Sequence, residues 1–126
     1  MMSVTVKVGN VNKVLSAVRE EIEELASEVV EGIWVQLVSD TPIDTGTAER
    51  SWQVVALGGT AETLERYDRR GTPIVFPGVP ESALRGDGVS IVSGVDYMSA
   101  LNNGWSSQAP SNFVEIAVDK ALLGFS

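Results

Sequence analysis

The fold is organised around one stretch of the chain, Thr41-Pro42-Ile43-Asp44-Thr45-Gly46-Thr47-Ala48-Glu49-Arg50-Ser51-Trp52. Because Pro42 has no N–H and favours an extended residue before it, a helix that arrives from the N-terminal side is expected to end by about Asp40. The Asp-Thr-Gly at 44–46 combines short polar side chains with a residue that tolerates positive φ, which predicts a tight turn. Residues 52–57 are rich in β-branched and aromatic side chains, which predicts a strand directly after the turn.

Length and charge limit the class of protein. A chain of 126 residues with 44% hydrophobic content can bury about two thirds of its unfolded surface, so we expect one globular domain over residues 1–126. The formal charge of -8, from 17 acidic and 9 basic residues, argues against sequence-independent binding to nucleic acid, which requires lysine and arginine. It also gives no attraction to an anionic membrane.

The residue types exclude several kinds of chemistry. The sequence has no cysteine and no histidine, which rules out disulfides, thiol chemistry, the usual zinc sites and the usual catalytic triads. Any catalysis would fall to carboxylates, hydroxyls or lysine, so an enzyme is disfavoured, and we assign no catalytic residues, cofactor or metal. The alternating N-terminus is unlike a signal peptide, and no apolar run is long enough to span a bilayer. These features predict a protein that is made and retained in the cytoplasm.

A strand and one long helix are predicted before the Thr41–Trp52 stretch. Val4, Val6 and Val8 alternate with polar residues, which predicts a short strand with one buried face. Apolar residues then recur in steps of three and four, which predicts a helix over about 11–38. They are Val11, Val14, Leu15, Val18, Ile22, Leu25, Val29, Ile33 and Leu37. The opposite face is charged and is expected to be solvated; it carries Arg19, Glu20, Glu21, Glu23, Glu24, Glu28 and Glu31.

The predicted helix is too long for the body of a compact domain. At 1.5 Å per residue it would measure about 42 Å, whereas a domain of this size has a radius of gyration of about 14 Å. Either Gly32 bends the helix, or one end projects beyond the body. The apolar stripe widens toward the C-terminal half, which favours projection of that half, with Trp34 and Val38 buried against another subunit.

Residues 59–88 predict a long loop. Glycine, proline and charged residues dominate this segment and no strong periodicity is visible, as is typical of a mobile or functional loop. Within it, Ile74, Val75 and Phe76 form an apolar run with strand character, which would be a liability if exposed. We expect this run to pair with a sheet edge of an adjacent subunit or another protein of the assembly, so that the loop becomes ordered on assembly.

A third strand and a last helix complete the expected fold. Residues 89–93 alternate as a strand, and a helix is predicted from about 112 to 123, with Gly124 ending it. Asn112 and Glu115 have the spacing of a capping box. The order of elements predicts an α+β fold in which the long N-terminal helix and the C-terminal helix pack on a small, mostly antiparallel sheet.

Only one tripeptide has a catalytic counterpart. Asp44-Thr45-Gly46 matches the active-site motif of retroviral-type aspartic proteases, in which two subunits each donate an aspartate. That motif lies at the end of an apolar strand, whereas Asp44 follows Pro42 and a helical pattern. Asp44 is therefore predicted to be a turn residue, and protease activity is a minor alternative. Trp105, after Asn-Asn-Gly, is expected to be exposed and to act as an interface anchor.

Two groups of residues together form a recognisable pattern. The first group comprises Thr41, Pro42, Asp44, Thr45, Gly46, Ser51 and Trp52. The second comprises Val95-Asp96-Tyr97, Asn103-Gly104, Gln108-Ala109-Pro110 and Phe113-Val114. In this order and spacing they resemble the tail-completion or head-tail joining proteins of long-tailed bacteriophages and prophages, relatives of the minor tail component Z. This chain departs from the pattern at the Asn-Asn-Gly of 102–104, where relatives commonly have Glu then Gly.

The resemblance implies a structural role without enzymatic activity. Identical subunits would form a ring in the neck of the virion, at the head-tail interface, after assembly in the cytoplasm of a bacterial host. The expected partners are copies of the same chain and adjacent neck, connector and tail proteins, and residues 74–76 are expected to pair with an adjacent subunit or neck protein. Passing DNA would make only non-specific contact with the lumen, and no membrane is involved. The alternative is a prophage-borne protein-interaction module that forms no ring.

Overall fold

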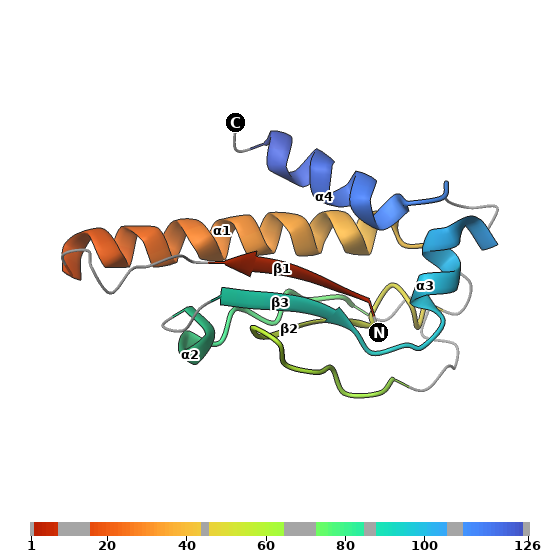
Figure 1. Cartoon of the computed structure of the whole chain (residues 1–126), viewed down its shortest axis with the longest axis horizontal. Helices are drawn as coiled ribbons and strands as arrows, with labels where there is room; N and C mark the ends of the chain where they lie inside the picture. Colours follow the sequence, from red (N-terminus) through yellow and green to blue (C-terminus); the bar gives the residue numbers. More distant parts are fainter. Residues whose placement is uncertain are drawn as a thin grey trace.

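The computed structural model describes residues 2–7, 16–43, 46–64, 73–84, 88–105 and 110–124, and these residues form an α+β fold. The strands β1 (Ser3–Lys7), β2 (Trp52–Ala56) and β3 (Gly88–Ser93) make one antiparallel sheet. Helix α1 (Ser16–Asp40) runs along the sheet, and α4 (Phe113–Leu123) packs against α1 (Figure 1). Three short helical elements complete the described part of the chain: α2 (Glu81–Leu84) precedes β3 in the sequence, and α3 (Met98–Ala100) and the π-helical turn η2 (Leu101–Trp105) follow it.

The sheet has the order β1-β3-β2, so the last strand in the sequence is central. The register places Val4 and Val54 on either side of Ile91. Because side chains alternate between the faces of a strand, these residues share one face, and that face belongs to the hydrophobic core beneath α1. All of β3 is buried, since it has a neighbouring strand on each side and is covered on both faces.

The second face of the sheet is covered by residues 57–64. The Gln53 side chain binds the backbone of Glu62 twice, with Nε2 donating to the Glu62 carbonyl at 2.8 Å and Oε1 accepting from the Glu62 N–H at 2.9 Å. The Leu64 N–H donates to the Gly94 carbonyl at 2.9 Å. A Cβ at Gly94 would collide with the Glu62 carbonyl oxygen, so this close approach requires glycine. The first part of the expected 59–88 loop is thus tied to the sheet.

The C-terminal half of α1 forms the core, and the N-terminal half extends past the strands (Figure 1). Val30, Ile33, Trp34 and Leu37 are buried, whereas the acidic side chains of Glu24, Glu28 and Glu31 are exposed. The expectation that the C-terminal half projects was therefore wrong. Its wider apolar stripe packs against other parts of the same chain, because Phe76 and Trp52 cover that flank. The expected helical start at residue 11 lies outside the described residues.

Candidate functional site

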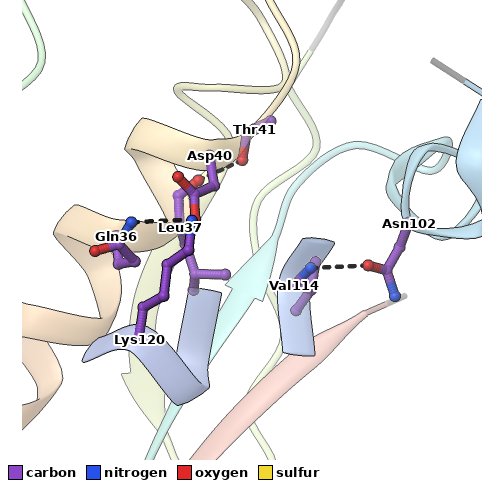
Figure 2. Close-up of polar contacts among 7 residues, drawn as sticks. All are labelled: Gln36, Leu37, Asp40, Thr41, Asn102, Val114 and Lys120. Atoms are coloured by element: carbon purple, nitrogen blue, oxygen red, sulfur yellow. Dashed lines mark hydrogen bonds and ion pairs between the residues drawn. The ribbon is translucent and has the colours of Figure 1, made fainter. Parts of the chain in front are cut away.

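Thr41 joins the end of α1 to the start of β2. Its hydroxyl donates to the Leu37 carbonyl at 2.5 Å, and its backbone N–H donates to the same carbonyl at 3.0 Å (Figure 2). The same hydroxyl accepts a hydrogen bond from Nε1 of Trp52 at 2.9 Å. Thr41 thus ends the helix and fixes the first residue of the following strand. Thr41, Pro42 and Trp52 are all buried, so this arrangement belongs to the core.

Trp34 is a core residue rather than an exposed interface residue. Its Nε1 donates to the Trp52 carbonyl at 3.0 Å, and only 6% of the residue is exposed. Its ring meets Phe76 edge-on, with centroids 5.3 Å apart and an interplanar angle of 61°. This corrects the expectation that Trp34 packs against another subunit. Val38 is half-buried and also packs on the core of its own chain.

Ser51 connects the same corner to the end of β3. Its hydroxyl donates to the Ala48 carbonyl at 2.6 Å and lies 2.8 Å from the Ser93 hydroxyl. Its carbonyl accepts from the Gly94 N–H at 2.9 Å. Buried polar groups are costly unless they are hydrogen-bonded, so this set of bonds fixes one arrangement of the chain.

Gly46 supplies the backbone turn that the Asp-Thr-Gly tripeptide predicted. It has φ of 82°, in the left-handed region that favours glycine. Its carbonyl accepts from the Arg50 N–H at 3.3 Å and from Arg50 Nη1 at 3.1 Å. Arg50 also pairs with Glu49 at 2.9 Å. Asp44 and Thr45 lie outside the described residues.

A second polar centre holds the start of α4, and it is built from Asn102. This residue is 3% exposed, and its Oδ1 accepts from the Val114 N–H at 2.9 Å (Figure 2). Its Nδ2 donates to both carboxylate oxygens of Glu115, at 3.1 and 3.0 Å. Its carbonyl accepts from the Asn112 N–H at 2.6 Å. The predicted capping box was wrong, because Asn112 adopts φ of 62° and its side chain makes no capping bond. Asn102 caps the helix from a distant part of the sequence instead.

Gly104 allows this close contact between η2 and the start of α4. It has φ of 92°, and a Cβ at this position would collide with the Ser111 hydroxyl. Of the other residues in the second motif group, Pro110 is exposed, while Gln108 and Ala109 lie outside the described residues. Trp105 closes η2, and its side chain is not among those described, so its predicted exposure stays a prediction.

The hydrogen bonds around Thr41 and those around Asn102 are connected through the pairing of α1 with α4. Asp40, the last residue of α1, accepts from Lys120 Nζ at 3.2 Å and from Gln36 Nε2 at 3.1 Å (Figure 2). Lys120 is 53% exposed, so this ion pair contributes at most about 1 kcal/mol. It nevertheless shows that the end of α1 faces α4.

A cleft of about 450 Å³ opens beside the free edge of β2. Its lining combines residues of α1, β2, the corner and the segment before α2, namely Trp34, Arg50, Trp52, Gln53, Val54, Val55, Pro73, Ile74, Val75 and Pro77. Residues 73–80 contain no strand, although Ile74 and Phe76 are half-buried on the core and Val75 is 78% exposed. The expected pairing of this run with a neighbouring subunit stays a prediction.

Within the described residues, no three His, Cys, Asp or Glu side chains are grouped closely enough to hold a metal ion. In the same part of the chain, every helix is too short or too polar to cross a bilayer.

Sequence reasoning missed three residues of this arrangement, which are Gln53, Ser93 and Asn102. Each bonds a partner that is nine or more residues away, beyond the reach of a local sequence pattern. The only sequence feature that could have indicated buried hydrogen bonds is that Asn102 and Ser93 are small polar residues next to apolar strands and turns.

No protein-family model, curated protein or solved structure matches this chain. The geometry of the chain itself therefore carries the functional argument.

Proposed function

We propose that this chain is a structural subunit of a bacteriophage neck, in which identical copies form a ring that joins or completes the tail at the head-tail interface. The observation that carries the proposal is that the motif residues make buried contacts between the main elements of the fold. Thr41, Ser51 and Trp52 lie in buried hydrogen bonds that join α1, β2 and β3. In the second group, Val114 donates its N–H to the Asn102 cap of α4, and Gly104 allows the close approach of Ser111. Residues of both groups therefore take part in the contacts that hold the helices on the sheet. Such a role is expected of motif residues in an assembly subunit.

The exposed surface of α1 supports an assembly role. Its N-terminal half extends past the sheet (Figure 1), and Leu25 on that half is 54% exposed. A helix that projects from its own domain offers apolar surface to a neighbour. We therefore place the contact between subunits on this half of α1, in place of Trp34 and Val38. The loop over 59–88 and the long helix would supply further contacts within the ring.

The acidic stripe of α1 suits the inner wall of such a ring. Glu24, Glu28 and Glu31 are exposed side by side along the helix, at spacings of four and three residues. Carboxylates repel the phosphates of DNA, so a lumen lined with them would let the genome pass without holding it. The chain would then contact DNA only transiently and without sequence preference.

Genetic complementation tests this proposal and the structural role of the Gly46 turn together. In a phage or prophage genome from which the gene is removed, we expect electron micrographs of lysates to show heads and tails that are not joined. The wild-type gene should restore joined particles. Asp44→Asn keeps the local hydrogen-bonding shape and should restore them within about threefold of wild type. Gly46→Val should reduce them by about tenfold or more, since valine disfavours φ of 82°.

Two outcomes would count against the proposal. Joined, infectious particles in the absence of the gene would show that the chain is not needed at the neck. Loss of function with Asp44→Asn, accompanied by peptide cleavage in the wild type alone, would instead favour an acid-dependent protease.

A further inference from the structure

The register of β2 determines which of its backbone groups lack a strand partner. The Leu57 N–H donates to the Gly88 carbonyl at 3.1 Å, and the Gly94 N–H donates to the Ser51 carbonyl at 2.9 Å. In an antiparallel pair, bonded residues alternate with residues whose N–H and C=O face away. Positions 51, 53, 55 and 57 therefore bond β3, while positions 52, 54 and 56 face the outer edge of the sheet.

Val54 is left with an available donor and acceptor on that edge. The outward carbonyl of Trp52 accepts from Trp34 Nε1, and that of Ala56 accepts from the Gly59 N–H at 2.8 Å. Within the described parts of the chain, no hydrogen bond reaches the N–H or the C=O of Val54. An unpaired strand edge of this kind is a template for another extended chain.

The cleft described above lies along this edge. Its volume of about 450 Å³ is in the range of ligand sites. Its far wall is the 73–77 segment, in which exposed and half-buried residues alternate as in an extended chain. Phe76 anchors that wall by its edge-on contact with Trp34. The 73–77 segment is therefore fixed on the core, and the cleft between it and β2 can accommodate a ligand.

The charge of the residues that line the cleft indicates the chemistry of the ligand it can bind. Among the lining residues that the structure describes, Arg50 is the one charged residue and none is acidic. The other lining residues are apolar or neutral, with tryptophan, valine and proline predominating. A guanidinium has five N–H donors and can contact more than one acceptor, so the Glu49 and Gly46 contacts of Arg50 are compatible with a further carboxylate.

We propose that this cleft binds an extended segment of a partner protein, apolar with one acidic side chain, which adds to the edge of β2 at Val54 and places its acid near Arg50. Main-chain hydrogen bonds to the strand edge would provide the register, and the pocket walls would select the side chains. The 73–77 segment acts as the wall of a receiving site, whereas the sequence alone indicated that it would be the donated strand. The inference does not depend on ring formation.

Hydrogen exchange with defined peptides tests the proposal on the full chain. The probes are capped seven-residue peptides that alternate valine and threonine, with one aspartate at each position in turn. The Val54 amide should exchange rapidly in the free protein and should slow by about tenfold or more with at least one peptide at about 1 mM. Replacing the aspartate of that peptide by lysine should weaken binding about tenfold.

A pair of proline variants isolates the strand edge. Val54→Pro removes an outward N–H and shortens a half-buried side chain on the core face. Edge strands tolerate proline at such a position, so the chain should stay folded by circular dichroism while losing about tenfold or more in peptide affinity. Val55→Pro is the matched control: it removes an N–H that bonds β3, and it should lower the melting temperature instead.

Several results would overturn the inference. They are a Val54 amide that is already protected in dilute free protein, no protection by any of the peptides, and unchanged peptide affinity in folded Val54→Pro. Protection that rises with protein concentration in the absence of peptide would assign the edge to a second copy of this chain and would also contradict it. If peptides bind but no ring forms, the cleft assignment stands and the neck proposal fails, so the two can be separated.

Discussion

Replacing Trp34 by alanine is expected to lower the free energy of unfolding by about 3–5 kcal/mol, the range for a large aromatic side chain removed from a core. The indole is almost fully buried, it donates to the Trp52 carbonyl at 3.0 Å, and it packs edge-on against Phe76. The substitution leaves a cavity, removes the hydrogen bond and detaches one wall of the cleft. Urea denaturation followed by circular dichroism measures the loss.

Val35 provides the matched control, because it is the next residue in the same helix and is 48% exposed. Val35→Ala should change the free energy of unfolding by no more than about 0.5 kcal/mol. Equal stabilities of the two variants would contradict the core assignment of Trp34. So would a folded, soluble Trp34→Glu monomer, because a carboxylate at this buried site would have no partner there and would prevent native packing.

Asn102→Ala is expected to cost about 2–3 kcal/mol of stability, more than an ordinary helix cap. The variant removes the acceptor for the buried Val114 N–H and both contacts with the Glu115 carboxylate. The first turn of α4 should then open locally. We expect a lower melting temperature together with faster hydrogen exchange at the Val114 amide.

Asn112 offers the contrast that identifies the true cap. It occupies the residue before α4 but makes no side-chain capping bond, and its φ is 62°. Asn112→Gly should therefore be neutral or slightly stabilising, because glycine adopts this conformation without cost. If Asn112→Gly were the more damaging of the two variants, the local capping box would be correct and the remote cap by Asn102 would be wrong.

The strands and the end of α1 at Asp40 could be predicted because local chemistry determines them. The alternating residue patterns of β1 and β3 predict strands, and Pro42 limits the helix that precedes it. These patterns were sufficient for an α+β fold with a small antiparallel sheet. They depend only on neighbours within a few residues.

Features that depend on distant partners could not be predicted in this way. The apolar stripe at Trp34 indicates burial, but only the fold shows that Phe76 and Trp52 supply the covering surface. Asn102 caps α4, and Gln53 bonds the Glu62 backbone and so holds residues 57–64 over the second face of the sheet. The run 74–76 has the composition of a strand, yet it lies extended beside β2 without joining the sheet.

The same division applies to the candidate site. The sequence singled out Thr41, Gly46, Ser51 and Trp52 as motif residues. In the structure Thr41, Ser51 and Trp52 take part in buried hydrogen bonds, and Gly46 has φ of 82°. It could not reveal the cleft, because the walls are separated in the sequence and come together only around the edge of β2. A free N–H and C=O on an edge strand are properties of the pairing register, which no residue type specifies.

Native mass spectrometry of the purified full chain, over a range of concentrations and with the proteins encoded beside it, tests the neck proposal most directly. The account predicts a single closed ring of fixed subunit number that appears at high concentration or on addition of a neighbouring protein. A monomer under every condition, including with each neighbour, would contradict it. The chain would then be better described as an interaction module that works through its cleft alone.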